Sequence, residues 1–417
     1  MEHGIGINYP EENVTPAPDS RRRATWSVGP VVDWLLREGR LSAEPSELVD
    51  TLAAKLLAAG APLWRLRLGF FTINPQLAAW AYVWMRGRST HVEQYPHGVQ
   101  QTDAYIGSPA QRMVDSGTPV RYRLDHLAPS DHRLLHELAA EGGTDYALFP
   151  LRFSDGSRNV FALATDDPQG FSAHDLASFE TLSHALSPVL EVAATRRIAE
   201  TLLDTYVGHR TGRRVLQGQI QRGAAETIHA ALWYSDLRDF TPLTETLPTP
   251  QLLAMLNEYF ETVAAAVSAR GGEILRFVGD AMLIVFPADA GHGSDLACRA
   301  AVDAALDAFA RLEAINRRRR QGGDPEIRFG VGLTAGEVVY GNVGAPDRLD
   351  FTVIGPSVNR AARLESLTKE LGVPLLMTAP FAGCLGRPVR SLGMHRLKGL
   401  PEPVEVYALE EAAGAGA

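Results

Sequence analysis

The chain has little cysteine: only Cys298 and Cys384 occur among its 417 residues. A secreted fold held by disulfides needs more cysteines than two, so we expect a reducing, cytoplasmic environment. No run of about 18 apolar residues occurs, which predicts that no helix spans a membrane. The start of the chain also lacks the basic end and the apolar segment of a signal peptide.

Positive charge is scarce as well. The 40 lysines and arginines are outnumbered by 49 acidic residues, which gives a net charge of −9. A basic run, Arg21 to Arg23, lies in a Pro-rich polar segment and indicates a solvated linker. These features argue against nucleic acid as the main partner. The 45% of hydrophobic residues fits a globular chain of two or three domains.

The N-terminal half divides into a polar lead, residues 1–30, and a segment of mixed pattern, residues 31–189. In the second segment, helical spacing gives way to strand-like alternation and then to helical spacing again. Ser172 and Asp175 have the spacing of an N-cap and its third-position acid. The elements expected are helices within 31–59, closed by Gly60, strands at 64–73 and 78–87, a hairpin within 144–166, and a helix over 170–207.

Residues 190–225 connect this segment to the rest of the chain. Their apolar residues recur at helical spacing, and we expect Gly208 and Gly212 to break the helix. The stripe can face a second copy and transmit a signal, or it can pack on its own domain as a spacer. The pattern leaves both interpretations open.

The C-terminal segment, residues 226–409, alternates strands with helices, which predicts a sheet with helices packed on it. Residues 410–417 are expected to form a flexible tail. The expected strands are 226–236, two within 273–286, two within 327–344 joined by a Gly-rich turn, and three short ones after 372; the expected helices lie within 237–245, 249–272, 295–320 and 357–372.

Two aspartates are the most informative residues of this segment. Asp236 ends an apolar strand, and Asp280 lies at the tip of a predicted hairpin, beside Asp236 if the strands pair. Two carboxylates at adjacent strand ends suit two divalent cations and a triphosphate. The turn after Asp236 leads into a helix, so the N–H groups of Phe240 and Thr241 are expected to meet phosphate oxygens. A lone aspartate at such a place is more often a cap or turn residue.

A third segment, DFTVIGPSVNRAARLESLTKE at 350–370, completes a pattern. Residues 226–409 resemble the catalytic domain of class III nucleotidyl cyclases, of the bacterial adenylyl cyclase type. The resemblance implies an α+β fold with a ferredoxin-like βαββαβ core, and conversion of ATP to cyclic AMP and pyrophosphate. It also assigns the ligands of two Mg²⁺ or Mn²⁺ ions to Asp236, Asp280 and the carbonyl of Leu237.

The same resemblance assigns three further residues. Asn359 and Arg363 lie four apart, on one helix face; they match a pair that orients the ribose and spreads the charge of the pentavalent phosphorus. A surface salt bridge from Arg363 to Glu365 or to a neighbouring residue is the structural alternative. Lys398 matches the lysine that holds the terminal phosphates, although a lone lysine is usually exposed to solvent.

Base selection departs from the family pattern. Arg276 stands where adenylyl cyclases of the family usually have lysine, and Thr352 stands where many have aspartate. Both side chains can bond adenine, and Arg276 can also donate to guanine O6. We therefore expect ATP as substrate, with a guanylyl cyclase or a catalytically weak nucleotide-binding module as alternatives.

In the family, the metal pair and the Asn–Arg pair meet only across a two-fold interface, which implies a homodimer with two shared sites. The order of elements in 31–189 resembles a GAF-type sensor domain, although no ligand motif supports it. Such a domain can bind a small-molecule or protein regulator, or it can serve only in dimerisation.

Two other groups of residues have a structural explanation. His132 and His136, with His126 nearby, have helical spacing, but no cysteine is near and apolar spacing already explains the helix. The aromatic residues of 80–84 alternate as on a strand, and core packing explains them better than a ligand pocket.

Overall fold

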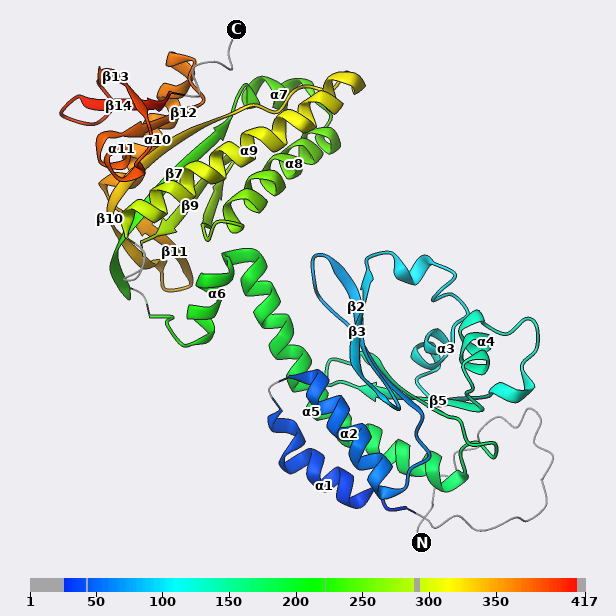
Figure 1. Cartoon of the computed structure of the whole chain (residues 1–417). Helices are drawn as coiled ribbons and strands as arrows, with labels where there is room; N and C mark the ends of the chain where they lie inside the picture. The colour runs from blue at the N-terminus through cyan, green and yellow to red at the C-terminus, as the bar shows by residue number, and fades with distance from the viewer. Residues whose placement is uncertain (1–25, 43, 222, 289–292, 411–417) are drawn as a thin grey trace. The chain divides into compact units, whose positions relative to one another are not determined.

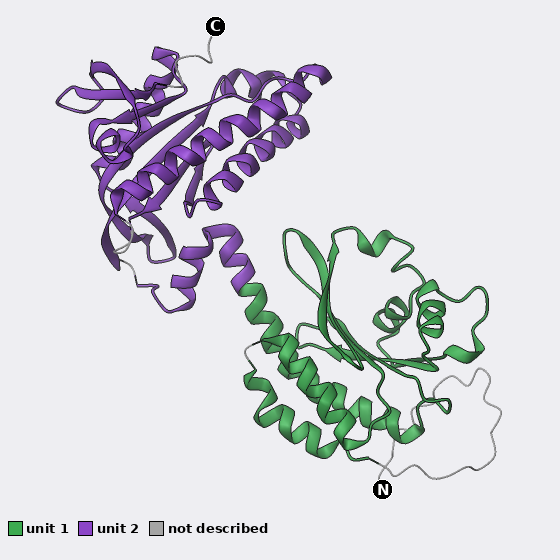
Figure 2. Ribbon diagram, in the orientation of Figure 1, with its two compact units in different colours: residues 1–199 green, residues 200–417 purple. Residues whose placement is uncertain are grey.

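The computed structural model describes residues 26–42, 44–221, 223–288 and 293–410, so most of the expected lead and nearly all of the expected tail lie outside the described residues. The chain forms two compact units, residues 1–199 and 200–417 (Figure 2). None of the helices in the described part of the chain is long and apolar enough to cross a membrane.

The first unit is built on a six-stranded sheet in the order β3-β2-β1-β6-β5-β4, with every neighbouring pair antiparallel. Figure 1 labels β2, β3 and β5 of this sheet. Its strands are β1 (Arg65–Phe71), β2 (Leu77–Met85), β3 (Arg88–Pro96), β4 (Val120–Arg123), β5 (Asp145–Arg152) and β6 (Arg158–Thr165). Its helices are α1 (Gly29–Arg37), α2 (Pro45–Ala59), α3 (Pro109–Ser116), α4 (Arg133–Ala140) and α5 (Ala173–Val207), with short 3₁₀ turns at Gly39–Leu41, Val99–Gln101 and Leu124–His126.

Helices cover both faces of this sheet. One core joins α1, α2 and α5 to the face that carries Leu66 and Leu68, and Trp84 packs in it. A smaller core joins α3 and α4 to the face that carries Tyr146 and Leu148. The aromatic residues of β2 thus pack as core residues, with Trp84 inside the larger cluster and Trp80 against it.

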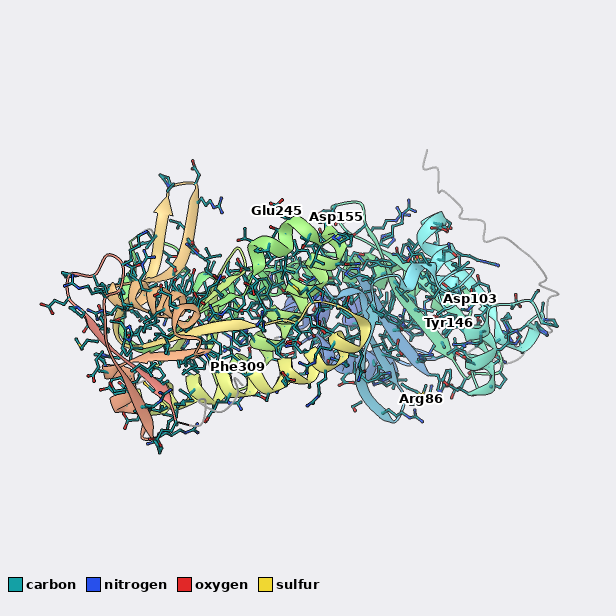
Figure 3. All side chains as sticks on the ribbon, turned by 90° about the horizontal axis from the view of Figure 1, so that it is seen from above. Arg86, Asp103, Tyr146, Asp155, Glu245 and Phe309 are labelled. Carbon is teal, nitrogen blue, oxygen red and sulfur yellow. The ribbon has the colours of Figure 1, made fainter. Side chains whose placement is uncertain are left out.

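Paired polar groups fix the ends of elements in this unit. The predicted cap of α5 is confirmed: the N–H of Ser172 donates to Asp175 (2.8 Å), and the N–H of Asp175 donates to Oγ of Ser172 (3.2 Å). Arg86, labelled in Figure 3, follows β2 directly. Its Nη1 donates to Asp166 at 2.9 Å. These polar groups are thereby satisfied within the fold.

Two details of this unit differ from the sequence-based expectation. Strand β3 was not expected; it is a mostly exposed strand at the edge of the sheet, so its side chains need no apolar alternation. His132 is not on the helix with His136. It is the N-cap of α4, and its Nδ1 accepts the N–H of Leu134 at 3.2 Å.

The second unit contains a sheet in the order β13-β14-β12-β10-β7-β9-β8, with β11 paired to β10. Its strands are β7 (Ala225–Leu237), β8 (Glu273–Val278), β9 (Ala281–Pro287), β10 (Phe329–Ala345), β11 (Arg348–Ile354), β12 (Leu375–Thr378), β13 (Val389–His395) and β14 (Val404–Leu409). Its helices are α6 (His209–Leu216), α7 (Phe240–Thr246), α8 (Thr249–Ser268), α9 (Ser294–Gly322), α10 (Pro356–Leu371) and α11 (Ala379–Leu385). The four strands β10-β7-β9-β8 are each antiparallel to their neighbours and are connected as βαββαβ, which is the expected ferredoxin-like core.

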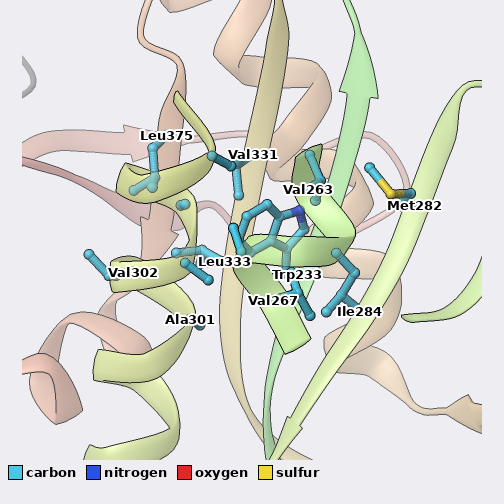
Figure 4. Packing of buried hydrophobic residues seen from close by; sticks show 14 of the residues in the cluster. Trp233, Val263, Val267, Met282, Ile284, Ala301, Val302, Val331, Leu333 and Leu375 are labelled. Carbon is cyan, nitrogen blue, oxygen red and sulfur yellow. The ribbon is translucent and has the colours of Figure 1, made fainter. Parts of the chain in front are cut away.

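Alternation along β7 sends side chains to two separate cores. Trp233 faces the larger core beneath α8 and α9, where it packs with Val263 and Ile284 (Figure 4). Leu232 faces the opposite side of the sheet, in the core that includes Ala361 of α10. The central strand is therefore apolar on both faces until it ends beside Asp236.

The expected turn within 327–344 is wrong, because β10 runs unbroken from Phe329 to Ala345. Its glycines permit close packing and not a turn. A Cβ on Gly332 would collide with the carbonyl oxygen of Ala361, and one on Gly341 would collide with Ala224 and Ala225.

The expected break at Gly208 is confirmed, since α5 ends at Val207 and Gly208 has a φ of 88°. The expected break at Gly212 is wrong, because this glycine lies inside α6. A Cβ there would come within 3.2 Å of Leu203, so the glycine permits close packing. Thr211 of α6 donates to Glu273 of β8 (3.2 Å), and Tyr340 of β10 donates to the same carboxylate (3.1 Å).

Candidate active site

The two aspartates predicted as metal ligands lie together at one edge of the sheet. Strand β7 pairs with β9 so that Ser235 lies opposite Met282, which brings the end of β7 next to the turn before β9. The carboxyl groups of Asp236 and Asp280 lie close enough for Asp236 to raise the pKa of Asp280. The hairpin geometry expected from the sequence therefore holds at this point.

The electrostatics of this pair suit a cation. Burial raises the pKa of Asp280 to about 7, and the hydrogen bond and negative charge of Asp236 add to the rise. Within the described residues, neither carboxylate forms an ion pair with a lysine, arginine or histidine. Two adjacent carboxylates without a counter-charge favour a divalent cation.

The donor set of this site is small. No group of three or more His, Cys, Asp and Glu side chains able to hold a metal occurs in the described part of the chain. Further ligands must then come from backbone carbonyls, water or phosphate. Leu237 follows Asp236 at the end of β7 and is buried. Its side chain has no polar atom, so its backbone carbonyl is the group that can bind a cation. The residues thus fit metal binding together with a phosphate-bearing substrate.

The loop after β7 has an unusual backbone. Asp239 has a φ of 58° and is the only non-glycine residue with positive φ among those described. Such a conformation costs about 1 kcal/mol or more and is common at functional sites. Phe240 and Thr241 follow at the start of α7, half-buried and exposed respectively. This strain was not anticipated from the sequence.

A buried ion pair lies beside this loop and was also missed. Nη1 of Arg238 lies 3.3 Å from Oε1 of Glu365, whose side chain is 5% exposed. Glu365 therefore pairs with Arg238, and the surface salt bridge considered for Arg363 does not form. Burial raises the pKa of Glu365 to about 7, although Arg238 acts in the opposite direction.

The predicted ribose and phosphate residues lie on α10, near its start. Asn359 and Arg363 are both exposed and are one helical turn apart. Within the described residues, no hydrogen bond or ion pair joins either side chain to Asp236 or Asp280. One chain therefore holds the two predicted pairs without direct contact between them.

The predicted base-selecting residues lie on two strands in contact, β8 and β11. Arg276 forms an ion pair with Asp350, and both side chains are about half exposed. They line an open hollow of about 1050 Å³ that α6 also borders. Thr352 is half-buried on β11, and Lys398 is exposed in the turn between β13 and β14.

Two neighbouring carboxylates at adjacent strand ends of a ferredoxin-like sheet suit an enzyme that uses divalent cations. Residues 224–411 match the model of one such family, the adenylate and guanylate cyclase catalytic domain. This part of the chain is a class III adenylyl/guanylyl cyclase catalytic domain.

This chain is also similar to named proteins. The chain is 31% identical over 262 residues to adenylate cyclase 1 of Rhizobium meliloti, and 33% identical over 199 residues to an adenylate cyclase of Anabaena cylindrica. These matches cover 61% and 46% of this chain, but only 37% and 38% of the two relatives. A solved bacterial light-regulated adenylyl cyclase is 32% identical over 45% of this chain and 92% of its own, with a TM-score of 0.40.

Proposed function

We propose that the chain converts ATP to 3′,5′-cyclic AMP and pyrophosphate. The observation that carries the proposal is the contact between Asp236 and Asp280 at the end of the central strands of a cyclase catalytic domain. Two carboxylates without a counter-charge are costly for a fold alone, but they are required where divalent cations meet a triphosphate.

In this proposal Asp236, Asp280 and the carbonyl of Leu237 hold two Mg²⁺ or Mn²⁺ ions. The bound ions would supply a lowered pKa for the ribose 3′-hydroxyl and neutralisation of triphosphate charge. The amides of Phe240 and Thr241 contact phosphate oxygens, and Lys398 binds the terminal phosphates.

The reaction needs positioning more than covalent chemistry. The 3′-oxygen forms a bond to the α-phosphorus while the bond from that phosphorus to the bridging oxygen breaks. The hydroxyl proton is lost to solvent, and pyrophosphate leaves with the electron pair. Asn359 orients the ribose, and Arg363 stabilises the charge on the equatorial oxygens.

The proposal includes a homodimer. Exposed Asn359 and Arg363 of one chain complete the metal site of the second chain, so that two equivalent sites form. This arrangement accounts for the lack of direct contact between the two pairs within one chain.

Adenine recognition is assigned to Arg276 and Thr352. Asp350 supports this assignment because it neutralises the guanidinium and limits its orientation, leaving its other N–H groups for the base. Guanine offers Arg276 an acceptor at O6, so a guanylyl cyclase is the second candidate.

The rest of the chain is proposed to regulate this activity in the cytoplasm. Residues 31–189 would form a GAF-like domain that takes a small-molecule or protein regulator, and 190–225 would transmit its signal. Contacts from α6 to Glu273 support the second role, because Glu273 lies on the strand that carries Arg276.

The test is product formation by the purified chain with Mn²⁺, offering ATP and GTP separately and separating products by chromatography. Cyclic AMP from ATP supports the proposal, and cyclic GMP from GTP alone replaces it with the second candidate. No product from either nucleotide, in a dimeric sample that binds ATP, would leave a nucleotide-binding signalling module.

A further inference from the structure

Three side chains form a connected group beside the proposed metal site; we call Arg238, Glu365 and Thr368 the Arg238 clamp. Nη1 of Arg238 bonds Oε1 of Glu365 at 3.3 Å, and Nη2 donates to Oγ1 of Thr368. The side chains of Arg238 and Glu365 are 17% and 5% exposed. The clamp therefore links the first residue after β7 to the second half of α10, largely away from water.

The clamp packs against the residue of β10 that lies opposite Asp236 in the sheet. Asp236 is paired with Gly330 of β10. A Cβ on Gly330 would collide with Arg238, Glu365 and Thr368, so only glycine leaves room for all three. The backbone of the proposed metal site is thus packed against the clamp on its neighbouring strand.

Of the two parts that the clamp joins, α10 is anchored by other contacts. Ala361 and Leu364 are fully buried in two cores, and the turn at Ala361 packs closely on Gly332. Helix α10 therefore keeps its place on the sheet without Arg238.

The loop after Leu237 has fewer contacts of its own. The N–H of Arg238 donates to the carbonyl of Arg328 at 2.7 Å, and Phe240 packs against the larger core. Asp239 is exposed and has a left-handed backbone, and the side chain of Arg328 that pairs with it at 3.1 Å is 65% exposed. Exposed ion pairs of this kind contribute about 1 kcal/mol or less. If the clamp is lost, we expect the loop to shift before α10 does.

We propose that the Arg238 clamp is a positioning device for the metal half-site of its own chain: it holds the carbonyl of Leu237 and the loop 238–241 in place against α10. This inference rests on the proposed function of Asp236 and Asp280. Arg238, Glu365 and Thr368 are positioning residues and touch neither the nucleotide nor the cations.

The first test removes the clamp without leaving a buried charge. In Arg238→Met/Glu365→Leu, apolar side chains replace the pair, a change that is often neutral or stabilising. We expect the Mn²⁺ concentration for half-maximal activity at saturating ATP to rise about 10-fold or more, as for other groups that orient metal ligands. Binding of Mn²⁺ alone, measured by calorimetry without nucleotide, should weaken in parallel.

Two further variants control this test. Arg319→Met/Glu258→Leu removes another partly buried arginine–glutamate ion pair, in which Nη1 of Arg319 on α9 lies 2.8 Å from Oε2 of Glu258 on α8. This variant should leave the Mn²⁺ requirement unchanged. Thr368→Val removes one arm of the clamp and should give a smaller shift of the same sign, which keeps the test valid if the double variant does not fold. An unchanged Mn²⁺ requirement in folded clamp variants overturns the inference.

Mixed dimers identify the half-site that the clamp serves. In a dimer of an Asp280→Ala chain with an Asn359→Ala chain, one shared site remains intact, and the Asn359→Ala chain supplies its metal ligands. The clamp substitutions should raise the Mn²⁺ requirement when placed on that chain and have no effect on the other. The reverse result would show that the clamp serves α10 and would overturn the inference.

The two proposals fail in different ways. If the wild-type chain makes no cyclic nucleotide, the proposed function fails, and Mn²⁺ calorimetry on the clamp variants still decides the inference. If the wild-type chain is active and the clamp variants bind Mn²⁺ normally, only the inference fails.

Discussion

Each unit of the molecule has an aspartate at the end of a buried strand, but the two units treat the charge in opposite ways. Asp145, at the start of β5, is wholly buried. Its carboxylate accepts hydrogen bonds from Nη2 of Arg121 (2.6 Å) and from the N–H of Phe171 (2.8 Å). Asp236, at the end of β7, contacts a second carboxyl group, that of Asp280.

The difference separates an acid that serves the fold from acids that serve a ligand. A buried carboxylate with an arginine and backbone donors is satisfied by its own chain. The Asp280 carboxyl group has backbone donors but no cationic partner, so it and Asp236 repel each other unless a proton or an added cation neutralises the charge. The predictions below test this contrast in decreasing order of effect.

The largest effect is expected at the second unit's pair. Asp280→Asn should lower kcat/KM by about 1000-fold or more, because removing one ligand of a catalytic cation loses several kcal/mol of charge stabilisation. The metal-free protein should become more stable, because the repulsion between two acids is gone. Thermal unfolding in a chelator and the product assay measure the two effects, and a loss of stability parallel to activity would contradict a ligand role.

The first unit's aspartate should respond in the opposite way. Asp145→Asn should destabilise its unit by about 3 kcal/mol, because Arg121 loses its buried partner. Denaturant unfolding of the full chain, with the transition of each unit followed separately, measures this loss. A stabilising effect here would remove the contrast between the two sites.

The half-exposed ion pair of Arg276 with Asp350 should affect the choice between ATP and GTP. Arg276→Ala should lower kcat/KM for ATP by about 10- to 100-fold, the value of a hydrogen bond from a charged donor. Arg348→Ala changes another cation that lines the same hollow and should have little effect. If the two variants behave alike in assays with ATP and GTP, the assignment of Arg276 to the base is wrong.

The smallest effect concerns pH. Burial raises the pKa of Glu365 to about 7, so the folded state binds its proton more tightly than the unfolded chain does. Its stabilising contribution is present at acid pH and is lost as pH rises through about 7. In metal-free protein, Glu365→Gln should therefore lose less stability than the wild type between about pH 5 and pH 8. Equal slopes for the two proteins would show that Glu365 does not titrate in this range.

The sequence predicted the catalytic unit best where chemistry constrains residue type. The apolar run that ends at Asp236 predicted a strand, and the two runs that flank Asp280 predicted a hairpin. The structure contains both, as β7 and as the pair β8 and β9. The turn expected within β10 failed because glycine has two uses, reversal of the chain and close approach, and the sequence does not distinguish them. The Arg238 clamp was missed because Arg238 and Glu365 are 127 residues apart in the sequence. Each of these residues alone resembles a surface residue.

The first unit was predicted less completely for a related reason. Its apolar strands and the Ser172 cap were evident, whereas the polar edge strand β3 has no periodic apolar signal. His132 was misplaced because capping by a histidine ring depends on local geometry that helical spacing does not encode. Nothing in the pattern of this unit specifies a ligand, which is why its regulator stays a proposal.

The central claim is that Asp236 and Asp280 of one chain act with Asn359 and Arg363 of another. The most direct test mixes purified Asp280→Ala and Asn359→Ala chains, each inactive alone, and measures product from ATP. The account predicts that activity returns, to about half that of the wild-type dimer in the mixed species because one of its two sites is intact. A mixture that stays inactive, although both chains fold and form mixed dimers, would contradict the shared site.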